Sequence, residues 1–229
     1  MTDAVRVIPI KNASKRLYHG VQMVSCSIAY PKFQASEFQK TLHALNDRYR
    51  LIAEESNRRC REELYRSALE QYRISQKEGY PFSPYELMRV FTVTYNAGCT
   101  LSLYFDEYQY TGGAHGLTVR TSDTWNLETG NPYALYDFFP EHYDYRSYIL
   151  TQVDAEIARQ TDAGNDIFFY NASALARDTF NEDSFYLTNK GIVVYFQQYD
   201  IAPYSSGIME FLIPYGDPVP ARPACRAGS

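Results

Sequence analysis

The sequence contains no long apolar segment. No stretch of 18 consecutive apolar residues occurs in the 229-residue chain, and residues 1–15 lack the apolar run that a signal peptide requires. The sequence therefore has no membrane segment. It predicts a cytoplasmic protein, or an extracytoplasmic one if a leader has been removed.

The chain also has few cysteines, and they are far apart. Cys26, Cys60, Cys99 and Cys225 form no CxxC pair and no Cys/His spacing typical of a zinc site. We therefore expect no metal and no cofactor. Because cytoplasmic thiols are normally kept reduced, we expect four reduced and mostly buried cysteines rather than disulfides.

Familiar catalytic motifs are absent from the sequence. It has no GxSxG, P-loop, HExxH or GxGxxG pattern, and its four histidines show no ligand spacing. An excess of positive charge is also missing, since the formal net charge is −5 and the 22 Lys and Arg residues are spread along the chain. This charge argues against a nucleic-acid partner.

The apolar patterns that are present predict an α+β fold in which antiparallel sheets pack against two main helices in two lobes. The N-terminal sheet-and-helix lobe is expected at residues 15–125, the C-terminal helix-and-hairpin lobe at 126–216, and a flexible tail at 217–229. Expected strands cover residues 21–29, 85–96, 100–110, 116–125, 185–187, 192–198 and 208–214. A short helix is expected near 173–180, and a second main helix at 143–160 carries Ile149, Val153 and Ile157 on one face.

The first main helix is predicted to run from Ser36 to Glu78, with Ser36 as its N-cap. Its core face has apolar residues at steps of three and four, namely Phe38, Leu42, Leu45, Tyr49 and Ile52. A straight helix of about 40 residues would be longer than a small domain is wide. We therefore expect a bend or break near 56–61, within a charged and solvated run.

The stretch Leu101–Asn126 is predicted to be two strands joined by a glycine-containing turn. Leu101, Leu103 and Phe105 alternate with polar residues and with Tyr104, Asp106, Tyr108 and Tyr110, so one face is core and the other is polar and rich in tyrosine. Gly112 and Gly113 supply the backbone freedom for a sharp turn that brings His115 beside the preceding strand. This turn is the first place to look for a site.

Tyrosine is unusually abundant, with 22 residues. Its rigid ring and polar hydroxyl suit recognition of sugars or proteins. We therefore predict a ligand-binding surface made of Tyr104, Tyr108, Tyr110, Gly112, Gly113 and His115. The alternative is that half-buried strands simply favour tyrosine.

Asp106 and His115 are the weak catalytic candidates, since a carboxylate that orients an imidazole makes a general base. The alternative is that His115 is a structural hydrogen-bonding group that ties the turn to its neighbour. Asp137 is expected to cap a helix rather than act as an acid.

Three ordered motifs carry a family resemblance: residues 110–116 (YTGGAHG), 126–130 (NLETG) with Asp137-Phe138-Phe139, and 185–207 (FYLTNKGIVVYFQQYDIAPYSSG). They resemble the paired bacterial domains of RsiV-type anti-sigma factors and of the accessory region in PdaC-type peptidoglycan deacetylases, over residues 18–215. The resemblance implies an α+β fold of two lobes. In the anti-sigma factors this region is extracytoplasmic and binds lysozyme, whereas in the deacetylases a separate metal domain is catalytic.

These observations favour a non-enzymatic binding or sensing module for cell-wall glycan or for a lysozyme-like protein. Two alternatives stay open, namely a cell-wall glycan hydrolase that uses Asp106 and His115, and a structural or assembly protein. Nothing in the sequence sets an oligomeric state.

Overall fold

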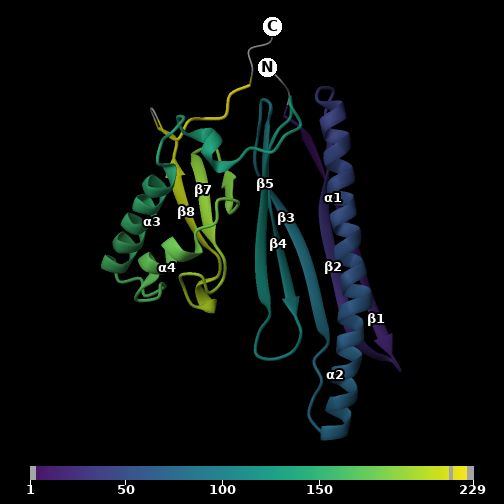
Figure 1. Ribbon diagram of the computed structural model, residues 1–229. Helices are drawn as coiled ribbons and strands as arrows, with labels where there is room; N and C mark the ends of the chain where they lie inside the picture. The colour runs from purple at the N-terminus through teal and green to yellow at the C-terminus, as the bar shows by residue number, and fades with distance from the viewer. Residues whose placement is uncertain (1–3, 217–218, 226–229) are drawn as a thin grey trace. The chain divides into compact units, whose positions relative to one another are not determined.

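The strands of the computed structural model, which describes residues 4–216 and 219–225, form two sheets. One sheet has five strands, in the order β1 (Arg6–Tyr18), β2 (Val21–Gln34), β3 (Tyr85–Ala97), β4 (Thr100–Tyr110) and β5 (Leu117–Asn126). The other sheet has three strands, in the order β6 (Phe185–Leu187), β7 (Gly191–Phe196) and β8 (Met209–Pro214) (Figure 1). The chain divides into two units. Unit 2 comprises Val5–Phe91 and Phe105–Val119, and the other described residues, namely Ala4, Thr92–Tyr104 and those from Arg120 onward, belong to unit 1. The predicted α+β class is confirmed, and the predicted boundary near residue 125 stays a prediction.

The first strand, β1 (Arg6–Tyr18), was not predicted. It pairs antiparallel with β2 (Val21–Gln34) through a turn at His19-Gly20, where both residues have positive φ. Its side chains are mostly exposed or half-buried, so no apolar alternation marks it as a strand. Lys11, Lys15 and Pro9 are residues that typically protect the edge of a sheet from pairing with other chains.

The strand expected at residues 21–29 is longer than predicted, because β2 continues through Pro31 to Gln34. Proline lacks an N–H, and a strand tolerates it where no neighbour needs that donor. The pairing of β2 with β3 runs from Val24 to Ile28, so Pro31 lies beyond it and faces Pro9 of β1.

The long helical segment has an interruption close to the predicted place. Helix α1 (Gln39–Arg59) passes into the π-helix η1 (Cys60–Leu64) and then into α2 (Tyr65–Glu78). A π-bulge inserts extra backbone without ending the helix, so the helical segment continues through the interruption from α1 into α2. The predicted N-cap at Ser36 is wrong. Phe38 occupies that position with φ 56°, and the Gln39 side chain reaches back to the Ser36 carbonyl oxygen at 3.4 Å.

The predicted core face of α1 is confirmed for Leu42, Leu45 and Tyr49, which are at most 3% exposed. The Tyr49 ring lies 5.9 Å from the Phe33 ring on β2 and 5.2 Å from the Phe105 ring on β4. Figure 1 shows α1 and α2 running along β2.

The next three strands of this sheet are β3 (Tyr85–Ala97), β4 (Thr100–Tyr110) and β5 (Leu117–Asn126), and all three were predicted. Strands β2 and β3 are parallel, and the helical segment between them makes the crossover that parallel pairing requires. Leu101, Leu103 and Phe105 are buried, which confirms the core face of β4.

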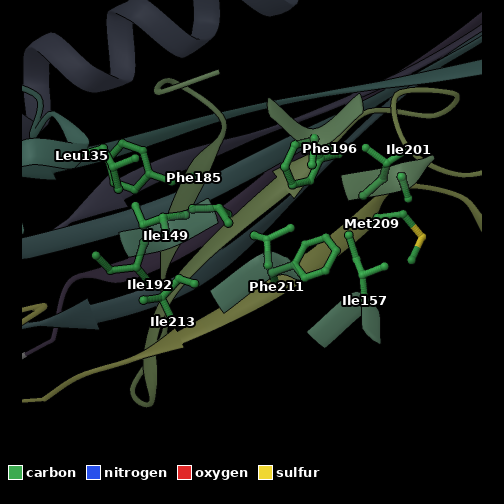
Figure 2. Close-up of a cluster of buried hydrophobic side chains, with 14 of the residues drawn as sticks. Leu135, Ile149, Ile157, Phe185, Ile192, Phe196, Ile201, Met209, Phe211 and Ile213 are labelled. Atoms are coloured by element: carbon green, nitrogen blue, oxygen red, sulfur yellow. The ribbon is translucent and has the colours of Figure 1, made fainter. Parts of the chain in front are cut away.

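Unit 1 contains the remaining elements: η2 (Leu135–Phe138), α3 (Tyr145–Asp162), α4 (Ala172–Thr179), β6 (Phe185–Leu187), β7 (Gly191–Phe196), η3 (Tyr204–Ser206) and β8 (Met209–Pro214). Strands β6, β7 and β8 pair antiparallel. Ile149, Val153 and Ile157 of α3 are buried, as predicted, in a cluster with side chains of β6, β7 and β8 (Figure 2).

The prediction of reduced cysteines is wrong, because each unit contains one disulfide. Cys26 of β2 bonds to Cys60 of the π-helix, and Cys99 bonds to Cys225. The pairs are 34 and 126 residues apart, so neither is visible as a local sequence pattern.

The predicted flexible tail includes 217–218 and 226–229, which lie outside the described residues. Between them, the Ala221 N–H donates to the Phe138 carbonyl at 2.8 Å, and Cys225 carries the disulfide to Cys99. The described part of the tail is therefore attached to unit 1 at two points. None of the described helices is both long and apolar enough to cross a bilayer.

Candidate functional site

The turn between β4 and β5 has the backbone that its glycines suggest. Gly112 has φ 94° and Gly113 has φ 91°, a region that side-chain-bearing residues rarely adopt. The Tyr110 hydroxyl donates to the Gly113 carbonyl oxygen at 3.0 Å. Tyr110 therefore helps to hold the turn closed from the end of β4.

A third glycine in this turn was not singled out by the sequence. Gly116 is buried, and a Cβ there would lie 2.5 Å from the Gln109 carbonyl oxygen and 2.6 Å from the Tyr108 ring. The Tyr108 ring therefore packs directly on the Gly116 backbone. This close approach is only possible because Gly116 has no side chain.

A pocket of about 370 Å³ opens beside this turn in unit 2. That volume is within the usual range for small-molecule sites. Its wall consists of the end of α2, the segment before β3 and the turn. The lining residues are Gln71, Tyr80, Pro81, Phe82, Ser83, Tyr85, Thr111, Gly112 and Gly113.

The end of α2 fixes the position of Tyr80 at the pocket. Gly79 adopts φ 77°, and the N–H groups of Gly79 and Tyr80 both donate to the Ser75 carbonyl oxygen, at 2.8 and 3.2 Å. This is a left-handed C-terminal cap, and it directs the chain away from the helix axis. The Gln71 side-chain amide then donates to the Tyr80 hydroxyl at 2.9 Å.

Two further rings complete the aromatic wall of the pocket. The Phe82 ring is stacked with the Tyr85 ring at 6.4 Å between centroids and meets the Tyr72 ring edge-on at 5.3 Å. Burial, with a smaller contribution from nearby Tyr80, raises the pKa of Tyr85 above its usual value. The Tyr85 hydroxyl therefore stays protonated around neutral pH and can donate a hydrogen bond.

The chemistry of the lining favours binding over metal chemistry. It combines three aromatic rings with amide and hydroxyl groups, and its nine residues include no carboxylate, imidazole or thiol. Such a surface presents flat apolar faces and neutral hydrogen-bonding groups to a ligand.

The predicted site residues do not all lie at this pocket. Gly112 and Gly113 line it, and Tyr110 supports them. His115 is exposed, with its Nδ1 3.1 Å from the Gly116 carbonyl oxygen, and Asp106 is half-buried on β4. The catalytic role suggested for Asp106 and His115 stays a prediction.

Tyr104 belongs to unit 1 and has a different environment. The Arg120 guanidinium lies 3.8 Å from the centre of its ring, and the Tyr186 ring is 5.1 Å away. Arg120 also forms an ion pair with Glu210. The Tyr104 ring therefore contributes to a cluster within unit 1, and its role in ligand binding stays a prediction.

Sequence reasoning missed Gln71, Tyr80, Phe82 and Tyr85 as site residues. Glycine and prolines punctuate the segment 79–84, a pattern typical of a linker rather than of a binding site. The feature that could have indicated a site is the pair of aromatic residues in this segment, Tyr80 and Phe82. Aromatic side chains in a short linker need a surface on which to pack.

Two family models match successive parts of this chain. Residues 20–118 match the model described as deacetylase PdaC, and residues 136–216 match a protein family of unknown function, DUF3298. The pocket and the Gly112-Gly113 turn lie within the first match.

The curated and structural relatives are distant. The peptidoglycan-N-acetylmuramic acid deacetylase PdaC of Bacillus subtilis is 27% identical over 118 residues, which is 51% of this chain and 25% of that protein. This chain therefore spans about a quarter of the length of that relative.

Two crystal structures of DUF3298 family proteins have a similar fold. The protein from Bacteroides fragilis is 20% identical with a TM-score of 0.67, covering 93% of this chain and 92% of that one. The protein from Pseudomonas aeruginosa is 18% identical with a TM-score of 0.57, covering 91% of each chain. At these identities the likeness concerns the fold alone.

Proposed function

We propose that this chain is a non-enzymatic, extracytoplasmic module that binds cell-wall glycan in the pocket beside the Gly112-Gly113 turn. The observation that carries the proposal is the aromatic wall that Tyr80, Phe82 and Tyr85 form beside this turn. A large well-formed pocket with apolar walls and a few convergent polar groups is the usual place to expect a ligand.

A neutral sugar ring complements this wall. Its C–H face packs on an aromatic face, while its hydroxyl and acetamido groups pair with neutral donors and acceptors. Gln71, Ser83 and Thr111 supply such groups around the rings. Tyr80 is 41% exposed, so part of its ring is available to a ligand without unfolding.

The extracytoplasmic location is supported by the two disulfides, because disulfides persist in oxidising compartments and are rare in the cytoplasm. Of the two locations left open by the sequence, we therefore propose the extracytoplasmic one. Mass spectrometry of the chain taken from its native cells, with thiols blocked at lysis, tests it. Four blocked thiols would contradict the location.

The similarity to a peptidoglycan deacetylase supports a role at the cell wall. The match covers a quarter of that protein, so we propose an accessory binding role and do not transfer its reaction. Gly112 and Gly113 shape the floor of the pocket in this proposal, and Tyr108 and Tyr110 keep the turn in place. His115 is then a structural group of the same turn.

A lysozyme-like protein is the second candidate ligand. The motifs at 126–139 and 185–207 resemble the region that binds lysozyme in RsiV-type anti-sigma factors. Co-sedimentation with purified peptidoglycan and pull-down with immobilised lysozyme separate the two ligand classes.

The variant Tyr80→Ala tests the proposed site. We expect it to weaken binding to peptidoglycan about tenfold, or about 1.4 kcal/mol, with little change in melting temperature. Tyr170→Ala is the matched control, since Tyr170 is a fully exposed tyrosine of unit 1 that does not line the pocket. Equal binding by wild type and Tyr80→Ala would contradict the proposed site.

A further inference from the structure

A second pocket, of about 480 Å³, lies in unit 1 between the 3-10 helix η2 and the start of α3. Tyr136, Phe139, Tyr143 and Tyr145 supply its rings, and Asp137 and Glu141 supply carboxylates. The pocket beside the Gly112-Gly113 turn has no carboxylate in its lining, whereas this pocket has two. This difference determines which ligand the pocket suits.

The rings form a fixed wall. Phe139 is 9% exposed and is stacked with Tyr143 at 6.0 Å and with Tyr145 at 5.4 Å between centroids. The Tyr148 ring meets both Phe139 and Tyr143 edge-on, at 6.2 and 6.0 Å. A stack buttressed in this way holds the Tyr143 ring in place before any ligand arrives.

Two rings of the wall remain accessible. Tyr136 is 57% exposed and Tyr143 is 37% exposed. Exposed aromatic rings gathered around a hollow are a feature of binding surfaces, whereas rings needed for packing alone become buried.

The backbone holds the loop between η2 and α3 in one shape. The Tyr143 N–H donates to the Pro140 carbonyl oxygen at 3.0 Å, and His142 adopts φ 63°, which is uncommon for a residue with a side chain. The Asp144 carboxylate then caps α3 by accepting from the Ser147 N–H at 3.1 Å. These contacts set the backbone positions of Glu141 and Tyr143 on either side of His142.

The charges around this pocket are mainly negative. Asp137 accepts the Ala134 N–H at 2.8 Å, which confirms its predicted capping role, and Asp144 caps α3. Glu141 is 89% exposed, and one of its carboxylate oxygens lies 3.4 Å from Nε2 of His142. The nearby Arg146 guanidinium lies 5.5 Å from the centre of the Phe180 ring.

We propose that this pocket binds the ammonium group of an amino sugar that lacks its N-acetyl group. The ammonium pairs with Glu141 and lies against the faces of Tyr136 and Tyr143, since aromatic faces attract cations. The sugar ring packs on the same aromatic surface. The inference rests on the proposed glycan-binding function and adds the chemical form of glycan that unit 1 recognises.

Titration of the full chain with a glucosamine tetramer and with an N-acetylglucosamine tetramer tests this proposal. We expect Glu141→Gln to weaken glucosamine binding about two- to fivefold, as for an exposed ion pair, and added salt to weaken the wild type similarly. Tyr136→Ala is expected to weaken it as well. Glu37→Gln is the matched control, because it removes an exposed carboxylate of unit 2 outside the pocket.

Three outcomes would overturn the proposal. If Glu141→Gln and Tyr136→Ala both bind the glucosamine tetramer as tightly as the wild type does, this pocket is not the binding site. If the wild type binds the two tetramers with equal affinity, the pocket does not prefer the ammonium form. Tighter binding of Nα-acetyl-lysine amide would assign the pocket to peptides. If Tyr80→Ala still weakens binding of the N-acetylated tetramer, the proposed function stands and this inference alone fails.

Discussion

At the scale of single residues, the turn between β4 and β5 depends on glycine for two different physical reasons. Gly112 and Gly113 have positive φ and open or distant surroundings, so backbone conformation is what excludes other residues there. Gly116 has no positive φ, and a side chain is excluded there because the Tyr108 ring leaves no room for a Cβ. The paired glycines predicted the first property, but only the three-dimensional packing reveals the second.

The first prediction follows from the φ of Gly113. Gly113→Val should destabilise the fold by about 1 to 3 kcal/mol, because a β-branched residue is strained at this φ. Gly113→Asn should cost less, because asparagine tolerates positive φ better than other side chains do. Urea unfolding of both variants measures the difference. A Val variant as stable as the Asn variant would show that the backbone does not limit this turn.

At the scale of elements, apolar periodicity predicted the strands and helices that have a buried face. Leu42, Leu45 and Tyr49 on α1, and Ile149, Val153 and Ile157 on α3, all face a core as expected. Strand β1 has no such pattern, since its side chains are mostly accessible, and it was missed for that reason. Edge strands held mainly by backbone pairing leave little trace in the sequence.

The second prediction uses two leucines of the same helix. Leu45 is 3% exposed and Leu51 is 56% exposed. Leu45→Ala should cost about 2 to 5 kcal/mol, because it leaves a cavity in the core of unit 2. Leu51→Ala should change the free energy of unfolding by about 0.5 kcal/mol or less. Equal losses in denaturant titrations would mean that α1 does not pack as described.

At the scale of the whole molecule, the fold class was predictable and the long-range connections were not. Each disulfide joins cysteines that tertiary structure alone brings together, and the expected reduced state followed from an assumed compartment. The same limit applies to the pocket. Gln71, Tyr80 and Gly112 come from a helix, a linker and a turn, so no local spacing could join them.

The central claim, that the pocket beside the Gly112-Gly113 turn binds glycan, is tested most directly by nuclear magnetic resonance. The ¹⁵N-labelled chain is titrated with an N-acetylated cell-wall tetrasaccharide. The account predicts that the backbone amide signals of Ser83, Thr111, Gly112 and Gly113, and the side-chain amide of Gln71, shift and saturate together. No shifts, or shifts confined to residues outside this pocket, would contradict it.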